Sequence, residues 1–408
     1  MKKFYLLLLA AILLASCLSC GNRYRVECCG GQNSEGNEVG GFCKGRFVKA
    51  EKKLSRQEAA AAMAVLEKKW FDETKKKYSS AIENKVIEYN DLKLKFAYRI
   101  CGEKPADGRS LYISMHGGGS IAASGNDSQW RNQINLYTPS EGVYVAPRAP
   151  WDAWNMWFQD GLCELFEQLI QAAVVYWDVN PDKVYLMGYS AGGDGAYKMS
   201  PRMADRWAAA SMMAGHPNGV SMLNLRNTPF MIWMGANDSS FNRNGMAAEY
   251  GKLLDDLQAN DPGGYIHETH IVADKGHWMD LEDAAALPWM AKYVREPYPD
   301  KVVWCQDDVA RMSFYWLAID KCDYKNGATV IAERKGNVID IIQCDYPKIT
   351  IYLNDAMCNL DKPVTVCYKG RKIYKGRVAR TEKTMSNTLF ASGDLRYMFP
   401  AAVEVKIP

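Results

Sequence analysis

Apolar runs and helical patterns alternate along residues 92–296 of the chain. Short runs of β-branched and aromatic residues favour strands, whereas apolar residues spaced three and four apart favour helices. The runs that predict strands are 92–100, 110–115, 142–146, 183–187, 208–213, 229–235 and 265–272, and helices are predicted over about 161–177, 192–203, 245–259 and 282–294. This alternation predicts a doubly wound, mostly parallel sheet with helices on both faces.

The segments on either side of this region have different patterns. Ser55 and Glu58 have the spacing of a capping box, and the Ala-rich run behind them predicts one or two helices over 56–87. After Pro297, β-branched and aromatic segments alternate with Gly, Asn and Asp turns, which predicts a small antiparallel, sandwich-like β domain. Its expected strands are 313–320, 328–334, 337–342, 348–353 and 363–368.

The first residues have the layout of an export signal. Two lysines precede an apolar run over 4–15 that is too short for an ordinary membrane span. Residues 14–17, Leu-Ala-Ser-Cys, resemble the lipobox of bacterial lipoproteins, where the cysteine becomes the acylated first residue of the mature chain. The sequence therefore predicts a lipid anchor at Cys17 and a place in the bacterial cell envelope, at the outer membrane or cell surface. A plain signal peptide cut nearby is the alternative, and Cys20 is a weaker candidate for the anchor.

The chain contains twelve cysteines, which an exported protein can oxidise to disulfides. If Cys17 is acylated, the eleven others cannot all pair. The densest group is Cys20, Cys28, Cys29 and Cys43, whose spacing leaves the connectivity open. The expected organisation is a signal peptide over 1–16, a Cys- and Gly-rich tether over 17–50, a helical segment over 51–90, a catalytic α/β domain over 91–296 and a β-rich accessory domain over 297–408.

An apolar strand over 183–187 runs directly into a Gly-x-Ser-x-Gly motif, formed by Gly188, Ser190 and Gly192. A tight strand-to-helix turn lifts such a serine out of the sheet edge, and the N-terminus of the next helix faces the reacting oxygen. The glycines are needed because larger side chains would collide across the turn. The motif alone is weak, but between a strand and a helix it predicts a nucleophile at Ser190.

A second glycine motif, His116-Gly117-Gly118-Gly119, directly follows the predicted strand 110–115. Backbone N–H groups of such a loop can donate to a developing oxyanion, and each fixed donor stabilises the transition state by about 2.7–4 kcal/mol. We expect the N–H groups of Gly117, Gly118 and Ala191 to form an oxyanion hole, with His116 holding the loop. A flexible glycine turn is the alternative.

The chain has only five histidines, so the candidates for the general base can be compared one by one. His267 and His270 lie three apart in a predicted strand, so they face opposite sides and cannot act together. His216 follows the strand 208–213 and could line the pocket rim or serve the core. His277 lies in a loop after the last strand of the α/β region, and we expect it to be the base.

The acid of such a site is expected between the serine and the histidine in the chain. Asp238 follows the apolar strand 229–235, whose end places it at the same rim of the sheet as Ser190. Asp274 is the competitor, but it is too close in sequence to His277 to lie opposite the imidazole. A catalytic triad of Ser190, Asp238 and His277 is therefore predicted, and it needs no metal or organic cofactor.

These motifs give the stretch from about 92 to 296 a family resemblance. Gly-Tyr-Ser-Ala-Gly-Gly, His-Gly-Gly-Gly, Gly-Ala-Asn-Asp and Lys-Gly-His-Trp-Met resemble those of secreted α/β-hydrolase esterases in the broad group of prolyl oligopeptidases and feruloyl esterases. The segment 361–366 resembles a β-rich C-terminal segment of some bacterial hydrolases. The resemblance covers about half the chain and implies the α/β-hydrolase fold and the triad, but it leaves the substrate open.

Aromatic residues follow two of the predicted strands, at the edge where the site is expected. They are Trp130, Trp151, Trp154, Trp157 and Phe158. We expect Trp154, Trp157 or His216 to contact substrate; the alternative for the tryptophans is to cover the core under a lid.

The near balance of 50 Lys and Arg against 47 Asp and Glu argues against nucleic acid as a partner. The expected substrate is an ester, either a small molecule or a polysaccharide that carries acyl or feruloyl groups. A serine peptidase of the prolyl-oligopeptidase type and a non-catalytic surface binding lipoprotein are the alternatives. Carbohydrate binding and structural packing both remain open for the C-terminal domain.

Overall fold

The structure, a computed structural model, describes residues 52–408 of the 408-residue chain. The expectations for the signal segment, for Cys17 and for the four clustered cysteines fall on residues 1–51 and lie outside the described residues. Seven cysteines fall within 52–408, and all seven are free thiols. In this part of the chain no helix is both long and apolar enough to cross a membrane.

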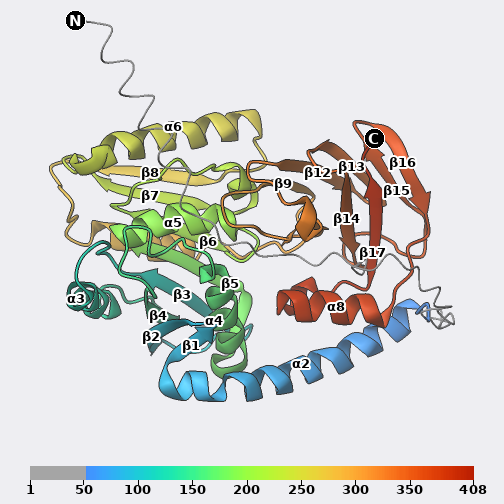
Figure 1. Cartoon of the computed structure of the whole chain (residues 1–408), viewed down its shortest axis with the longest axis horizontal. Helices are drawn as coiled ribbons and strands as arrows, with labels where there is room; N and C mark the ends of the chain where they lie inside the picture. Colours follow the sequence, from blue (N-terminus) through green and yellow to red (C-terminus); the bar gives the residue numbers. More distant parts are fainter. Residues whose placement is uncertain (1–51) are drawn as a thin grey trace, which may run out of the picture. The chain divides into compact units, whose positions relative to one another are not determined.

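An eight-stranded sheet, in the order β1-β2-β4-β3-β5-β6-β7-β8, forms the centre of the α/β region (Figure 1). The pairs β1–β2 and β2–β4 are antiparallel, and every later pair is parallel. The strands are β1 (Val86–Tyr89), β2 (Leu92–Cys101), β3 (Arg109–Met115), β4 (Gly142–Arg148), β5 (Val179–Tyr189), β6 (Ala209–Met213), β7 (Phe230–Gly235) and β8 (His267–Val272). Each predicted strand is present, β1 is an addition, and the predicted α/β-hydrolase fold is confirmed.

Helices cover both faces of this sheet. Along β3, Leu111 and Ile113 belong to one buried cluster, whereas Tyr112 between them belongs to another. The first cluster lies under α4 (Leu162–Trp177), α5 (Ala191–Arg202) and α6 (Arg243–Asn260), and the second lies under α3 (Ala123–Ile134) and α7 (Ala286–Met290). Strands buried on both sides need apolar residues at successive positions, which explains why their runs are nearly continuous in the sequence.

The predicted helix over 282–294 is wrong in its extent. The segment forms a short 3-10 helix, η3 (Glu282–Ala285), and the one-turn helix α7, after which the chain turns away. Arg295 draws the chain back to the sheet, because its backbone N–H donates to the carbonyl of Asp182 in β5 at 2.9 Å. A helix continued to 294 would not make this contact.

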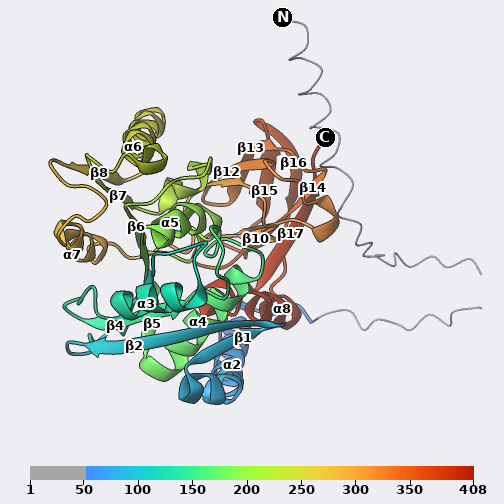
Figure 2. The same cartoon turned by 60° about the vertical axis from the view of Figure 1, so that its left-hand side comes forward.

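The helix expected over 56–87 is a single long helix, α2 (Arg56–Asn84), and it begins at the predicted capping box. The backbone N–H of Glu58 donates to Ser55 Oγ at 3.2 Å, and that of Ser55 donates to Glu58 Oε2 at 2.9 Å. Figure 1 and Figure 2 show α2 alongside both α4 and α8 (Glu382–Ser392). Leu66 and Trp70 of α2 pack with side chains from these helices, so α2 spans from the α/β region to the C-terminal region.

The C-terminal region contains two sheets, as the sequence predicts. One has the order β10 (Ser313–Phe314), β11 (Leu317–Ala318), β14 (Lys348–Leu353), β17 (Ala401–Lys406); the other has β16 (Arg371–Gly376), β15 (Val364–Tyr368), β13 (Val338–Cys344), β12 (Thr329–Lys335), β9 (Lys301–Cys305). All pairs are antiparallel except β13–β15. The run 313–320 forms two short strands instead of one, because Tyr315 at a φ of 52° turns the chain between them.

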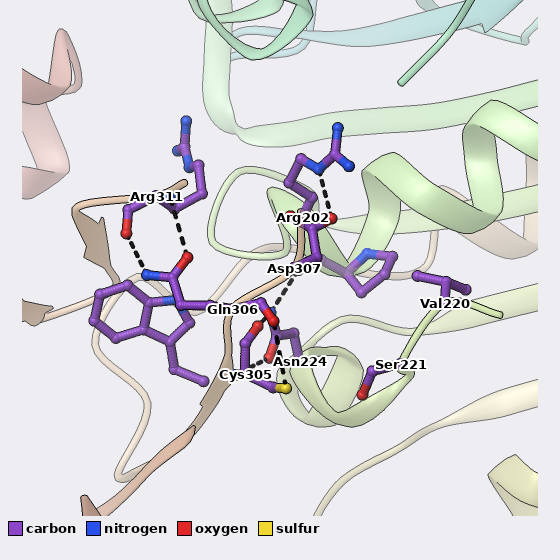
Figure 3. A pocket seen from close by; sticks show the side chains of 10 residues that line it. Arg202, Val220, Ser221, Asn224, Cys305, Gln306, Asp307 and Arg311 are labelled. Carbon is purple, nitrogen blue, oxygen red and sulfur yellow. Dashed lines mark hydrogen bonds and ion pairs between the residues drawn. The ribbon is translucent and has the colours of Figure 1, made fainter. Parts of the chain in front are cut away.

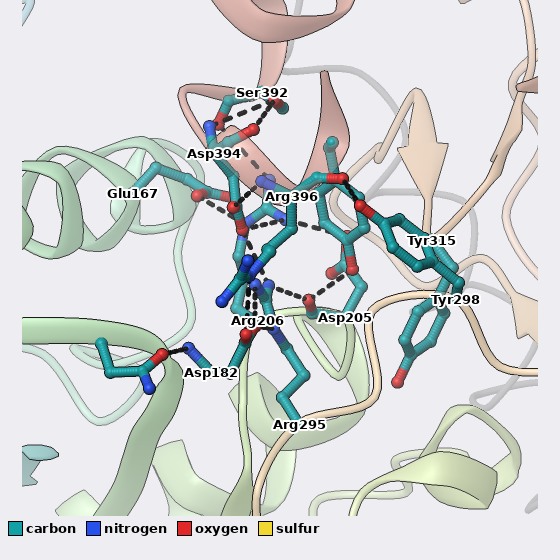
Figure 4. A network of polar contacts seen from close by, with 12 residues as sticks. Glu167, Asp182, Asp205, Arg206, Arg295, Tyr298, Tyr315, Ser392, Asp394 and Arg396 are labelled. Atoms are coloured by element: carbon teal, nitrogen blue, oxygen red, sulfur yellow. Dashed lines mark hydrogen bonds and ion pairs between the residues drawn. The ribbon is translucent and has the colours of Figure 1, made fainter. Parts of the chain in front are cut away.

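A buried ionic network joins the two regions (Figure 4). The guanidinium of Arg295 donates to Asp182 Oδ1 in β5 and to Asp394 Oδ2 beyond α8, each at 2.8 Å. A further ion pair in this network joins Arg206 Nε to Glu167 Oε2 at 2.7 Å. Buried charges of this kind are tolerated only when each one faces an opposite charge, so the network fixes how the C-terminal segment docks.

A second polar junction lies at the end of α5 (Figure 3). Arg202 donates to Asp307 Oδ2 at 2.6 Å and to Asp308 Oδ1 at 2.8 Å, just beyond β9. The Gln306 side chain accepts from the backbone N–H of Arg311 at 3.1 Å and donates to its carbonyl at 2.5 Å. Because these groups satisfy one another, the small pocket between them is a structural junction.

The Arg295→Met substitution tests the ionic network. It would leave Asp182 and Asp394 buried with incomplete compensation, since each would retain only one cationic partner, Arg396 or Arg206. We expect the free energy of unfolding, measured by urea titration, to fall by about 3–5 kcal/mol. The matched control is Lys68→Met, which breaks an exposed ion pair on α2 and should have a much smaller effect. Equal effects of the two substitutions would contradict this role.

Candidate active site

Ser190 occupies a sharp turn between β5 and α5. Its φ of 59° and ψ of −121° are rare for a residue with a side chain, and its backbone N–H donates to Met213 at 2.9 Å. A Cβ on Gly188 would lie 2.1 Å from the carbonyl oxygen of Gly192, and a Cβ on Gly192 would lie 2.1 Å from that of Met115. Both glycines are therefore required by backbone contacts, as the sequence predicts.

The structure brings the three predicted triad side chains together. His277 Nε2 lies 2.9 Å from Ser190 Oγ, and His277 Nδ1 lies 2.7 Å from Asp238 Oδ2. A carboxylate only accepts, so Nδ1 donates to Asp238, and the lone pair of Nε2 is left to accept the serine proton. Asp238 is buried beyond the end of β7, whereas the imidazole is partly open to solvent. This geometry matches a general base with its orienting acid.

The loop that carries His277 is held against the rest of the site by backbone contacts. A Cβ on Gly235, at the end of β7, would lie 2.0 Å from the carbonyl oxygen of Gly276. The hydroxyl of Tyr189, next to the serine, donates to the carbonyl of His277 at 2.6 Å. The competing acid, Asp274, adopts a φ of 60° in the same loop, whereas the imidazole faces Asp238.

His116 holds the glycine loop from inside the core. The backbone N–H of Ala149 donates to its Nε2 at 3.1 Å, so Nδ1 carries the proton and donates to the carbonyl of Gly117 at 2.6 Å. Burial lowers the pKa of His116 to about 4, and the ring is therefore neutral near pH 7. These contacts agree with the expectation that His116 supports the loop and does not transfer protons.

Asn126, in α3, fixes the other end of the glycine loop. Its Oδ1 accepts from the N–H of Gly119, and its Nδ2 donates to the carbonyl of the same residue, both at 2.9 Å. Gly118 has a φ of 114°, and a Cβ on Gly117 would lie 3.1 Å from the Cβ of Ser190. The loop backbone thus lies against the serine, which is where an oxyanion hole made by Gly117, Gly118 and Ala191 would have to lie.

A cavity of about 530 Å³ opens beside these residues. Trp154 and His216, two of the predicted substrate contacts, line it, and Trp154 exposes 58% of its surface. The expectation for Trp157 is wrong: its side chain is fully buried, and its Nε1 donates to the carbonyl of His116 at 2.8 Å. The complete lining is Gly118, Gly119, Ser120, Ile121, Trp154, Ala191, Asp194, His216, Asn218, Phe241 and Arg243.

The other aromatic residues and histidines considered in the sequence analysis make structural contacts. Trp130 Nε1 donates to the carbonyl of Ala146, and Phe158 is buried in the core. His267 Nε2 lies 3.0 Å from Asp255, whereas His270 stacks on Trp233 with ring centroids 4.2 Å apart. These two histidines thus have separate structural contacts.

Asp194, one turn into α5 from the serine, is a cavity residue that sequence reasoning missed. Its Oδ1 accepts from the backbone N–H of His216 at 2.6 Å. Burial is the main reason that its pKa is raised to about 6, and this hydrogen bond and the charge of Arg243 offset only part of the effect. The cavity therefore holds a carboxyl group that titrates near neutral pH.

The raised pKa of Asp194 makes stability depend on pH. Below about pH 4 the carboxyl is protonated in both folded and unfolded chains; between about 4 and 6 the unfolded chain releases a proton that the folded chain keeps. Stability therefore falls as the pH rises through this window, by on the order of 3 kcal/mol in all.

Asp194→Asn should remove this loss, because the amide still accepts from His216 but does not titrate. We expect the variant to gain stability relative to the wild type between pH 4 and pH 8 in urea unfolding. The titration of His116, whose pKa is lowered to about 4, changes the stability of the variant and of the wild type equally. It therefore cancels when their unfolding free energies are subtracted. If the difference in unfolding free energy between Asp194→Asn and the wild type stayed constant from pH 4 to pH 8, the raised pKa of Asp194 would be contradicted.

Comparison with known proteins finds similarity at low sequence identity to solved structures of esterases. No protein-family model matches the sequence, and no curated protein matches it. Among solved structures, the chain is similar to a thermostable esterase, with a TM-score of 0.41 and 14% identity over 52% of this chain and 62% of that one. It therefore spans less than two thirds of that esterase. It is also similar to an acetyl xylan esterase from Aspergillus awamori (TM-score 0.35, 11% identity, 48% of this chain and 93% of that one) and to a ferulic acid esterase (TM-score 0.35, 15% identity, 51% of this chain and 95% of that one).

Proposed function

We propose that the chain is a serine hydrolase that cleaves carboxylic esters through an acyl-enzyme. The observation that carries the proposal is the continuous hydrogen-bonded series from Ser190 Oγ through the imidazole of His277 to the carboxylate of Asp238. A serine hydroxyl is a poor nucleophile until a base removes its proton, and this series supplies a base held in the right tautomer.

In the first half of the reaction, Ser190 Oγ attacks the carbonyl carbon of the ester while its proton passes to His277 Nε2. The carbonyl oxygen becomes an oxyanion, which the N–H groups of Gly117, Gly118 and Ala191 stabilise. The C–O bond to the alcohol then breaks, and His277 returns the proton to the departing oxygen. The second half repeats these steps with water as the nucleophile, releasing the acid and restoring Ser190.

We propose an exported enzyme whose substrates are acyl or feruloyl esters on polysaccharides. What supports this is the expected export signal and lipid anchor, which would place the enzyme outside the cytoplasm, where polymers are degraded. A peptidase could use the same triad, so a panel of aryl and alkyl esters must be compared with aminoacyl-proline amides. Faster cleavage of the amides would replace the ester proposal with a peptidase.

Ser190→Ala tests the enzyme proposal directly. We expect kcat/KM for 4-nitrophenyl acetate or methyl ferulate to fall by about 10⁴-fold or more, because the nucleophile is lost. Labelling by a fluorophosphonate probe should vanish with it. Ser79→Ala, at an exposed position on α2, is the control and should keep both the ester hydrolysis and the labelling by the probe. A Ser190→Ala protein that remains fully active would refute the mechanism, and an unlabelled wild type would favour the binding lipoprotein.

The lipid anchor is tested separately in bacterial cells. Wild-type chain should incorporate radiolabelled palmitate and fractionate with membranes, because Cys17 supplies the thiol to be acylated. Cys17→Ser should lose both properties, whereas Cys20→Ser should keep them. Palmitate incorporation that survives in Cys17→Ser but not in Cys20→Ser would move the anchor to the second cysteine.

A further inference from the structure

The cavity beside Ser190 is lined by two chemically different kinds of side chain. Ile121, Trp154 and Phe241 present large apolar surfaces to it, and all three are exposed. Asp194 and Arg243 present groups of opposite charge. The triad uses neither of these charged groups in its proton transfers, so their presence in the cavity needs a separate explanation.

Arg243 has hydrogen-bonding capacity to spare. Its side chain is only 15% exposed, yet its buried Nε has no acceptor among residues 52–408. One Nη lies 3.9 Å from Asp238 Oδ1, which is too long for a hydrogen bond, and 3.4 Å from the carbonyl of Ser240. The protein therefore leaves this guanidinium incompletely paired, and a ligand in the cavity that Arg243 lines can accept from its Nη groups.

The backbone directly before Arg243 is strained. Phe241 and Asn242 have φ values of 57° and 56°, two left-handed residues in succession without a glycine. Phe241 leaves 79% of its surface exposed, and the guanidinium of Arg243 lies 4.9 Å from the centroid of its ring. Strain of this kind persists when the surrounding structure enforces it, and it gathers at binding sites.

Asp194 supplies the complementary acceptor. Its Oδ1 accepts from the N–H of His216, and a carboxylate oxygen can accept more than one hydrogen bond. A cavity with one guanidinium and one carboxyl group is close to neutral, so a ligand with a full charge of either sign would meet one repulsive partner. A hydroxyl group both donates and accepts and therefore suits the pair.

We propose that Arg243 and Asp194 form a subsite for the hydroxyl groups of a neutral sugar in the alcohol part of the ester, with Trp154 covering the C–H face of the ring. The inference rests on the proposed esterase function and deepens it. Arg243 donates to a sugar oxygen through the Nη groups of its guanidinium, Asp194 accepts from a neighbouring hydroxyl, and the exposed indole packs on the apolar face. These contacts with the sugar make Arg243 and Asp194 determinants of substrate specificity.

The test compares pairs of esters that share an acyl group and differ in the alcohol. The pairs are 6-O-acetylglucose with ethyl acetate, and 5-O-feruloylarabinose with methyl ferulate. Wild-type enzyme should favour the sugar ester of at least one pair in kcat/KM, and Arg243→Met should reduce that preference by about tenfold or more. Arg243→Lys should not restore it, because lysine lacks the planar fork of donors. Arg371→Met, an exposed change on β16, is the control and should keep the preference.

Two kinetic results would overturn the proposal. One is an unchanged preference in Arg243→Met. The other is an equal loss on both esters of a pair, which would mean that Arg243 acts through Asp238 and not on the sugar.

Binding to Ser190→Ala separates this inference from the function. Calorimetry should show that the Ser190→Ala protein binds methyl β-glucoside and that it binds methyl β-glucuronide no more tightly. The double variant Ser190→Ala, Arg243→Met should bind methyl β-glucoside about tenfold or more weakly. Tighter binding of the uronide, or no binding of the glucoside, would overturn the neutral-sugar subsite. If the wild type cleaves no ester but these results hold, the function fails and the subsite stands.

Discussion

Backbone contact without intervening side chains is the constraint on which the site depends. At the edge where the strands end, the turns meet so closely that a single methyl group would collide: Gly188 faces Gly192, Gly192 faces Met115, and Gly235 faces Gly276. These contacts lock the serine turn to β3 and the histidine loop to β7. The close approach of these backbones places the three triad side chains within hydrogen-bonding distance of one another.

Much of this arrangement could be predicted because it is local. The strands β3 to β7 contain apolar runs, and the serine, the acid and the base each follow a strand that ends at the same edge. What escaped prediction depends on how the loops fold. Tyr189 contacts His277, 88 positions away, whereas Asn126 and Arg243 contact residues only 7 and 5 positions away in loops that turn back. Sequence spacing alone identifies none of these pairs. Trp157 was mistaken for a rim residue for the same reason, since only its bond to His116 shows that it faces inward.

The site also lowers the stability of the protein. A partly buried carboxyl group at Asp194, a serine and a phenylalanine in left-handed conformations, and an arginine with an unpaired donor all disfavour the folded state. Features of this kind accumulate where a protein must meet a ligand, because the groups that would relieve the strain are supplied by that ligand. The surrounding core, closed on both faces of the sheet, compensates for these losses.

The network around Arg295 has a consequence for the order in which the molecule can be completed. Asp182 belongs to a central strand, whereas Asp394 follows Arg295 by 99 positions in the chain. During synthesis from the N-terminus, the guanidinium of Arg295 can meet Asp182 before Asp394 has been made. The α/β region therefore reaches its finished state only after the segment beyond α8 has left the ribosome.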